Sequence, residues 1–394
     1  MYEAVIIGGA RTPIGRFGGA LKDIPAWELG ALAIRAAVER TGVSPDAIDE
    51  VIMGNVIQAA DSGYAARKAA LAAGLPDTVP AMTVNRACSS GLEAINVAVQ
   101  AIRTGEAEVV VAGGAESMSQ APYLLPKARF DGLRLGDATL VDSVLLGISC
   151  PIYDYHMGMT AENVAERYEI SRRDQDELAV VSHARAVAAQ REGRFNSQIV
   201  TVSVPQRRGE SIQVTEDEHP RADTSMETLG KLVSAFKEGG TVTAGNSAGI
   251  NDGAAAVVLM SEARAKAEGF TPRLRWVGRG VSGVDPAYMG IGPSPATRKA
   301  LERTKLTLAD MDLIELNEAF AAQVLYVARD LGLDMEITNV DGGGISLGHP
   351  VGATGAIMVV KLMEELTWHD GHLGLATLCV GGGQGVATIF ERLS

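Results

Sequence analysis

Cys88 is the first residue in this sequence whose type and position suit a catalytic role. It lies in NRACSSG at 85–91, between a short apolar segment typical of a buried strand, AMTV, and a segment with apolar residues on nearly every helical face. Serines can cap a helix, and the unpaired amides of its first turn lower the pKa of a nearby thiol. A lone cysteine is more often a small buried apolar residue, so a catalytic Cys88 needs partners.

Three more polar residues follow or end predicted strands. Asn317 follows DLIEL, His349 lies in the glycine-rich loop GGGISLGHPVGATG, and Cys379 ends LATLC before three glycines. Each alone has an ordinary structural explanation, as a helix cap, a solvated loop residue or a core residue. Because open α/β sheets build their sites at strand ends, the four positions together predict one catalytic site.

The surrounding segments alternate between strand-like and helix-like patterns, which predicts a layered α/β fold. The second half repeats the order of the first, since EVIMGNV matches DLIELNE and EVVVAGG matches LATLCVGGG. We predict an N-terminal half (1–117 with 250–269), an inserted loop domain (118–249) with two helices, and a C-terminal half (270–394). The duplicated halves favour a site at their interface.

Composition and charge narrow the possible functions. The 394 residues exceed the roughly 250–300 at which a single core stops growing. A net charge of −13 argues against nucleic-acid or anionic-membrane partners, and the apolar runs are too short for a membrane helix. Three cysteines without a CxxC pair argue against a disulfide framework or a zinc site. The N-terminus is unlike a signal peptide, and both observations favour the cytoplasm. IIGGARTPIGRFGG lacks the GxGxxG spacing of a dinucleotide loop.

The chain resembles the thiolase family over its whole length. ACSSG, NEAFA, GHPVGATG and CVGGG occur in this order, and TAENVA, NDGAAA and MGIGP add to the likeness. The resemblance implies a thiolase-like duplicated α/β/α/β/α core with an inserted loop domain. It also implies reversible Claisen condensation of two acetyl-CoA molecules to acetoacetyl-CoA, or CoA-dependent thiolysis of a 3-ketoacyl-CoA.

By this resemblance, Cys88 is similar to the acylated nucleophile and His349 to its base. Cys379 resembles the second thiol, which moves a proton at the substrate α-carbon, and Asn317 the residue that holds a water in one oxyanion site. The backbone amides of Cys88 and Gly381 correspond to a second oxyanion site. An activated thiol, a base and oxyanion donors are what this chemistry requires. Coenzyme A is a substrate, and the resemblance implies no metal or other cofactor. We expect iodoacetamide to alkylate an activated Cys88 well below pH 8.5, the rough pKa of a free thiol.

Seven further residues are expected to bind the substrate. The resemblance gives His156, Met157, Arg221, Ser247, Met289, Ala319 and Phe320. The histidine, methionines and phenylalanine are also compatible with ordinary core packing. Arg221 is the leading candidate for the adenine end of CoA, ahead of the other basic residues of the insertion, Arg207, Arg208, Lys231 and Lys237.

Three residues depart from the family pattern. Ser247 lies one position from the serine that contacts pantetheine in many thiolases. Asp341 stands where many relatives have asparagine and alters the charge of the histidine loop. Gln384 stands where several short-chain enzymes have methionine, which weakens a short-chain assignment.

Two other functions fit parts of the sequence. A ketoacyl synthase of the same fold uses one catalytic cysteine, so Cys379 favours a thiolase. A noncatalytic CoA- or lipid-binding protein on this scaffold would be expected to lose at least one site residue, and all four are present. Thiolases are dimers or tetramers, and 118–249 resembles their tetramerising loop domain, so we expect a homotetramer.

Overall fold

The chain alternates helices and strands as its sequence predicts. The structure, a computed structural model, describes residues 2–130, 132–133, 135–206 and 209–394. The helices are α1 Ala26–Thr41, α2 Ala65–Ala72, α3 Ser90–Thr104, α4 Ser143–Gly147, α5 Met157–Arg167, α6 Arg172–Arg191, α7 Met226–Gly230, α8 Glu262–Glu268, α9 Pro293–Thr304, α10 Ala321–Leu331, α11 Gly344–Leu347 and α12 Thr354–Trp368. In these described ranges, no helix is long and apolar enough to cross a bilayer.

Sixteen strands accompany these helices in the part of the chain that the structure describes. They are β1 Ala4–Arg11, β2 Gly15–Arg16, β3 Glu50–Gly54, β4 Ala81–Val84, β5 Val109–Ser117, β6 Tyr123–Leu124, β7 Val141–Asp142, β8 Ser149–Cys150, β9 Tyr155–His156, β10 Val202–Val204, β11 Ile212–Val214, β12 Asn251–Ser261, β13 Leu274–Gly283, β14 Leu313–Leu316, β15 Leu373–Val380 and β16 Gln384–Arg392. Every residue of β5 and β12 is buried, as expected for strands covered on both faces.

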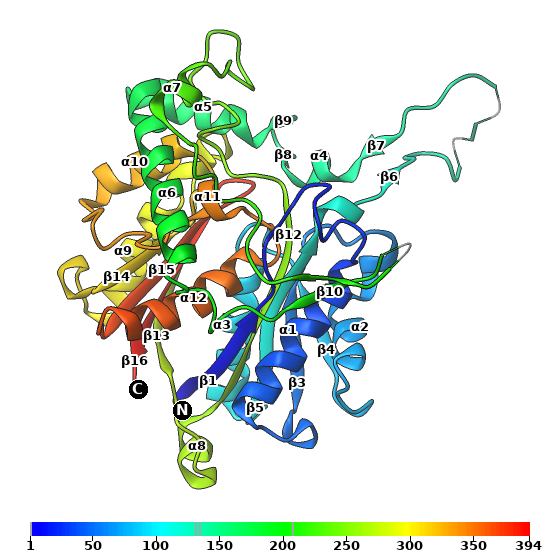
Figure 1. The fold of residues 1–394 in the computed structure, drawn as a ribbon, viewed down its shortest axis with the longest axis vertical. Coiled ribbons are helices and arrows are strands. Elements are labelled where there is room, and N and C mark those ends of the chain that lie inside the picture. The colour runs from blue at the N-terminus through cyan, green and yellow to red at the C-terminus, as the bar shows by residue number, and fades with distance from the viewer. Residues whose placement is uncertain (1, 131, 134, 207–208) are drawn as a thin grey trace.

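The main sheet confirms the duplicated topology. Its order is β14-β15-β16-β13-β1-β12-β5-β3-β4, and β2 pairs with β12. The parallel β3–β5 pair corresponds to the parallel β14–β15 pair, and the antiparallel β5–β12 pair to β15–β16. A parallel bridge between Ile314 and Thr338 stands where β4 pairs with β3 in the first half. Short pairing of β1 with β13 joins the halves (Figure 1).

Helices α3 and α12 pack against each other near the centre of the molecule (Figure 1). Their residues share one apolar core with strands of both halves. A Cβ at Gly355 would lie 2.4 Å from the backbone nitrogen of Leu92, so only glycine fits at this crossing. Because α3 begins just after Cys88 and α12 just after His349, the crossing brings these two residues to one place.

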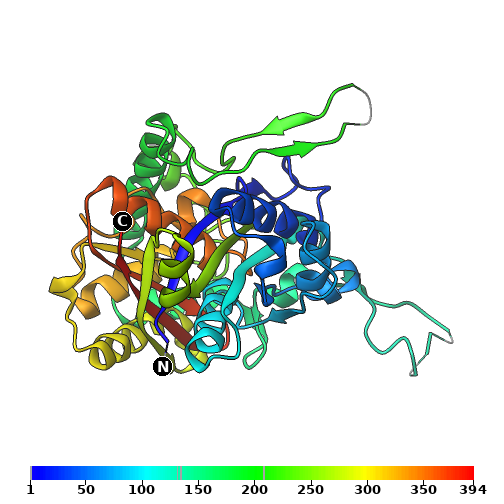
Figure 2. The ribbon, with the colours of Figure 1, turned by 90° about the horizontal axis from the view of Figure 1, so that it is seen from below.

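The inserted segment carries α5 and α6, the two helices predicted there, and two projecting arms. Helices α5 and α6 pack on α10 of the C-terminal half. The hairpins β6–β7 and β10–β11 form the arms, which leave the body of the molecule in different directions (Figure 2). The residue boundaries of the three regions remain predictions.

Strand β4, which we expected to be buried, is an edge strand. It ends the order of the main sheet, and Met82 is 40% exposed. The short apolar pattern of AMTV does not distinguish an edge strand from a central one, because both present apolar side chains to the helices beside them. The segment before Cys88 therefore lies at an open sheet edge.

Candidate active site

Cys88 lies on a tight turn between β4 and α3. Ala87 has a φ of 42°, a left-handed conformation that costs energy for a residue with a side chain. The turn is held by hydrogen bonds from Ser89 N to Arg86 O at 3.1 Å and from Ser90 N to Ala87 O at 3.0 Å. Strain of this kind is common where a reactive side chain must be presented, and Cys88, half-buried as a residue, lies on the wall of a cavity.

The two serines stabilise this turn and do not cap α3. The Ser89 hydroxyl donates to Arg86 O at 3.0 Å, and the Ser90 hydroxyl donates to Ala87 O at 2.7 Å. The backbone amides of Gly381 and of Cys88 itself lie close enough to the Cys88 sulfur to lower the pKa of the thiol. The expected capping of α3 by serine is wrong, whereas the use of these two amides as oxyanion donors stays a prediction.

Burial determines the protonation of Cys88. It raises the pKa of the thiol, and the amides of Gly381 and Cys88 lower it by less, so the net shift is upward. The expected low pKa is therefore wrong for the resting protein, because desolvation of a thiolate outweighs two backbone dipoles. Cys88 needs a base at the moment of attack.

His349 is suited to be that base. Its Nδ1 lies 2.7 Å from Thr354 Oγ1, and the Thr354 hydroxyl donates to Pro350 O at 3.0 Å. Since the hydroxyl has one proton, it must accept from Nδ1–H, which leaves Nε2 unprotonated. Nε2 is buried without a hydrogen-bond partner among the described residues. Burial also lowers the pKa of His349 to about 4, so the ring is neutral near pH 7.

Alkylation by iodoacetamide tests this protonation state. Because the pKa of Cys88 is raised and a neutral His349 offers no positive charge, we expect the rate to rise with pH around a midpoint above about 8.5. The rate should be followed by mass spectrometry of the peptide that contains Cys88. A midpoint well below 8.5 would instead show a preformed ion pair of Cys88 and His349.

Asn317 and Cys379 end adjacent strands of the second half. Asn317 follows β14 and its N–H donates to Thr377 O at 3.0 Å, while Cys379 lies near the end of β15. Asn317 is 3% exposed, and its Nδ2 has no partner among the described residues. Burial raises the pKa of Cys379 well above its usual range, and the proximity of Cys88 adds to the shift. Cys379 is therefore a protonated thiol at rest.

Most of the predicted site residues line one cavity of about 410 Å³. Cys88, His349 and Gly381 line it, whereas Asn317 and Cys379 are not part of its wall. Cys379 packs in the apolar cluster that also contains Met157, Met289, Ala319 and Phe320. All seven expected substrate residues line the cavity: His156, Met157, Arg221, Ser247, Met289, Ala319 and Phe320.

An aromatic stack forms one wall of this cavity. The His156 ring stacks on Phe236 with centroids 4.6 Å apart, and Phe236 meets Phe320 edge to face at 6.1 Å. His156 Nδ1 accepts from Gly158 N at 2.9 Å, so Nε2 carries the proton of the neutral ring. We did not predict Phe236, because it lies in an irregular stretch without a motif. The stack gives the cavity a rigid, mostly apolar wall.

Among the described basic residues considered for CoA, Arg221 is the one that lines the cavity. Its side chain is exposed, and its N–H donates to His183 Nδ1 at 3.2 Å. Lys231 pairs with Glu227 at 2.7 Å and Lys237 with Glu166 at 2.6 Å. Arg207 and Arg208 lie outside the described residues.

The departures from the family pattern have local explanations. Ser247 donates its hydroxyl to Thr243 O at 2.7 Å, so the shifted serine stabilises its own loop. Gln384 lies within 3.4 Å of both Arg86 and the Gly381 carbonyl, and is not part of the cavity wall. Asp341 is buried and accepts from Arg194 at 2.5 Å. Of the three residues, Ser247 alone lines the cavity.

Two supporting residues were missed from the sequence. Asn251 Oδ1 accepts from His349 N at 2.9 Å, and Thr354 fixes the His349 ring as described above. Both belong to motifs that carry the family resemblance, NDGAAA and GATG. Their contacts with His349 could have been suspected only from that membership.

Known proteins agree with this geometry. Residues 4–263 match the thiolase N-terminal domain and residues 270–392 the thiolase C-terminal domain. An acetyl-CoA acetyltransferase of Pseudomonas aeruginosa is 52% identical over 393 residues, and a probable acetyl-CoA acyltransferase of Staphylococcus aureus is 51% identical, each match covering 100% of both chains. The crystal structure of the Bacillus anthracis acetyl-CoA acetyltransferase has a TM-score of 0.98 at 50% identity and covers 100% of this chain and 99% of that one. Human mitochondrial 3-ketoacyl-CoA thiolase in complex with CoA has a TM-score of 0.96 at 44% identity, with 100% and 98% covered. The chain belongs to the thiolase family.

Proposed function

We propose that this thiolase cleaves 3-ketoacyl-CoA with CoA, and in reverse condenses two acetyl-CoA molecules to acetoacetyl-CoA, through an acyl-Cys88 intermediate. One observation carries the proposal. Cys88 and His349 line one cavity, and Cys88 lies close enough to the second thiol, Cys379, to raise its pKa. A single acyl transfer needs one thiol, whereas carbon–carbon cleavage needs a second group to protonate the departing carbon.

The first half of the cleavage forms the acyl enzyme. His349 Nε2 takes the Cys88 proton, and the thiolate attacks the 3-keto carbonyl. The new oxyanion accepts hydrogen bonds from the amides of Cys88 and Gly381, which lie near the Cys88 sulfur. The carbon–carbon bond breaks, and the acetyl-CoA enolate takes the Cys379 proton at its α-carbon. A raised pKa keeps Cys379 protonated and ready for this step.

The enolate oxygen needs its own donors. We propose protonated His349 Nε2 and a water held by Asn317 Nδ2 as these donors, since neither atom has a protein partner among the described residues. In the second half, CoA gives its thiol proton to the Cys379 thiolate and attacks the acyl-Cys88 carbonyl. Cys88 leaves and recovers its proton from His349. Condensation is the reverse path.

The arrangement does not favour a ketoacyl synthase. A synthase obtains its carbanion by decarboxylating a malonyl thioester and does not need a proton donor at the position of Cys379. The thiolase domains match the chain across both halves. A noncatalytic CoA-binding protein has no use for a base with the fixed tautomer of His349.

We also propose a homotetramer that works in the cytoplasm. Strand β4 leaves an open sheet edge, and the β6–β7 arm carries exposed apolar side chains, among them Phe130 at 92% and Leu135 at 101% exposure. Side chains of this kind usually mark contact surfaces. The substrates are acyl-CoA and CoA, bound through Arg221 and the cavity.

The test is CoA-dependent loss of acetoacetyl-CoA, measured beside a long-chain 3-ketoacyl-CoA at equal concentration. We expect cleavage of acetoacetyl-CoA. Comparable or faster cleavage of the long substrate would make the protein a broad 3-ketoacyl-CoA thiolase. Cleavage of neither, together with release of CO₂ from a malonyl thioester, would replace the proposal with a synthase.

A further inference from the structure

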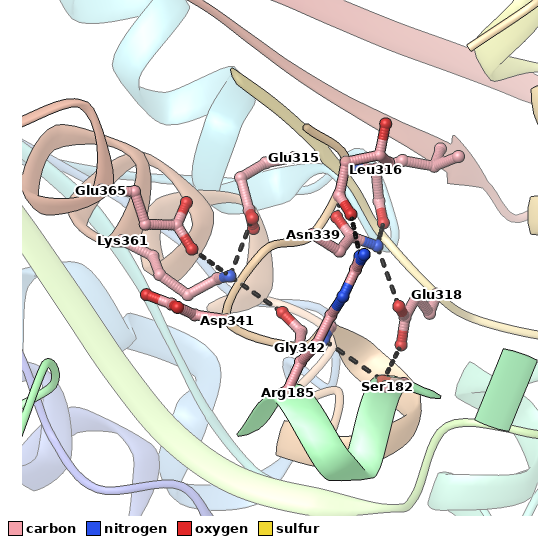
Figure 3. Close-up of polar contacts among 12 residues, drawn as sticks. Ser182, Arg185, Glu315, Leu316, Glu318, Asn339, Asp341, Gly342, Lys361 and Glu365 are labelled. Carbon is pink, nitrogen blue, oxygen red and sulfur yellow. Dashed lines mark hydrogen bonds and ion pairs between the residues drawn. The ribbon is translucent and has the colours of Figure 1, made fainter. Parts of the chain in front are cut away.

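Figure 3 shows a network of buried polar side chains, none of which lines the substrate cavity. We call it the rear network. It consists of Ser182, Glu315, Glu318, Asn339, Asp341, Lys361 and Glu365. Three of its carboxylates and its ammonium group are each at most 3% exposed as side chains. Burying so many charges is costly, and apolar packing would often stabilise a core as well, so their placement calls for a reason beyond stability.

Lys361 ties three elements together at one nitrogen. Its Nζ donates to Glu315 Oε1 on β14 at 2.7 Å, to Gly342 O in the histidine loop at 2.8 Å and to Glu365 Oε1 on α12 at 2.7 Å. Glu315 lies two residues before Asn317, and side chains two positions apart along a strand point to the same face. Lys361 therefore holds the strand that leads to Asn317 against the loop that leads to His349.

Glu318 makes the same connection on the other side of Asn317. Its carboxylate accepts from Ser182 Oγ at 2.6 Å on α6, from Asn339 Nδ2 at 2.9 Å and from Ile345 N at 3.2 Å in the histidine loop. A Cβ at Gly343 would lie 2.4 Å from the Glu318 carboxyl carbon, so the loop packs directly on this side chain. Glu318, the residue after Asn317, is thus bonded to α6, to Asn339 and to the turn before His349.

Asn339 and Ser182 complete the rear network. The Asn339 side chain pairs with both backbone groups of Leu316, accepting from its N–H at 2.9 Å and donating to its carbonyl at 2.8 Å. Ser182 Oγ lies 2.8 Å from Ser346 Oγ, within the histidine loop. Asn317 is therefore bracketed by two fixed neighbours, Leu316 and Glu318.

The network reaches the catalytic side chains through a small gap. A cavity of about 20 Å³ is bordered by Glu315 and Lys361 and also by Asn317 and Thr354, the partner of His349 Nδ1. Because all four residues border this cavity, a displacement of Glu315 or Lys361 is expected to move Asn317 and, through Thr354, His349. Asp341, the unusual residue of this loop, pairs with Arg194, and its negative charge adds to the rise in the pKa of Lys361.

We propose that Glu318 and Lys361 are positioning residues that set the separation of His349 Nε2 and Asn317 Nδ2, and so build the site for the enolate oxygen. The proposal rests on the proposed roles of His349 and Asn317. It predicts that damage to the network lowers kcat and leaves KM for acetoacetyl-CoA nearly unchanged, since no network residue lines the substrate cavity.

The test is a double-mutant cycle of Glu318→Gln with Asn317→Ala, measured by thiolysis of acetoacetyl-CoA. Glutamine presents an NH₂ group where Glu318 accepts from Asn339 or from Ile345, so one of those hydrogen bonds is lost. A misplacement of about 1 Å can cost about 100-fold in rate, and we expect a kcat loss of roughly 10- to 100-fold. In the Asn317→Ala background the same change should have a clearly smaller effect, because the atom that Glu318 positions is gone.

Other outcomes are decisive. Equal losses in both backgrounds, or an unchanged kcat in folded Glu318→Gln and Lys361→Met proteins, would overturn the positioning proposal. An unchanged kcat in Asn317→Ala alone would instead overturn the proposed catalytic role of Asn317. If both charge variants fail to fold, Ser182→Ala takes their place in the cycle, since it removes hydrogen bonds to Glu318 and Ser346 without stranding a charge.

Ile34→Ala is the control for general destabilisation. Ile34 is fully buried in the core around α1, away from the rear network. This variant should lower the melting temperature and keep kcat at a temperature well below unfolding. A kcat loss in Ile34→Ala matching that of Glu318→Gln would reduce the network to a stabilising role and contradict the proposal.

Discussion

Replacing Cys88 by alanine should abolish both thiolysis of acetoacetyl-CoA and exchange of acetyl groups between acetyl-CoA and CoA. Without the sulfur no acyl enzyme forms, and removal of a nucleophile that acts as a unit with its base costs about 10⁴-fold or more in kcat. Both reactions should be followed with radiolabelled acetyl-CoA and by loss of acetoacetyl-CoA absorbance.

Cys150→Ala is the matched control for this variant. Cys150 is a buried cysteine on β8 and does not line the substrate cavity. The control should keep most of its activity. Exchange at near-normal rate in Cys88→Ala would move the covalent step to another residue and contradict the mechanism.

Cys379→Ala should separate the two halves of the reaction. Acetyl exchange needs only acylation of Cys88 and its reversal, and CoA can lose its thiol proton to solvent, so exchange should persist. Thiolysis and condensation need a proton at the α-carbon, and loss of a general acid–base group costs about 100- to 10,000-fold. The comparison of exchange with condensation in one preparation measures the separation.

A different pattern would contradict these roles. If Cys379→Ala loses exchange as completely as condensation, Cys379 takes part in acylation itself. If it keeps condensation, the proton at the α-carbon moves through another group, and His349 would be the next to test.

The catalytic residues were accessible from the sequence because each ends or follows a strand in a repeated pattern. The repeat of EVVVAGG in LATLCVGGG placed Cys379, and the structure confirms the matching positions of β5 and β15 in the two halves. The roles of these residues came from the family resemblance and remain proposals.

What the sequence could not provide depends on contacts between distant segments. The raised pKa of Cys88 follows from burial and from Gly381, nearly three hundred positions away along the chain. Phe236 stacks on His156 across an irregular loop, and Lys361 meets Glu315 only because α12 packs beside β14. Local sequence patterns do not predict such contacts between distant residues.

The edge position of β4 shows the same limit. AMTV is apolar on both faces, so its pattern predicts burial and not its place in the sheet order. That place is fixed by the pairing of β3 with β5 on its other side.

The measurement that tests the central claim most directly is mass spectrometry of the protein after brief incubation with acetyl-CoA and acid quenching. We expect one acetyl group on the peptide that contains Cys88, removed when CoA is added before the quench and absent in Cys88→Ala. An unmodified Cys88 peptide in protein that turns over acetoacetyl-CoA, or an acetyl group on Cys379 instead, would contradict the account.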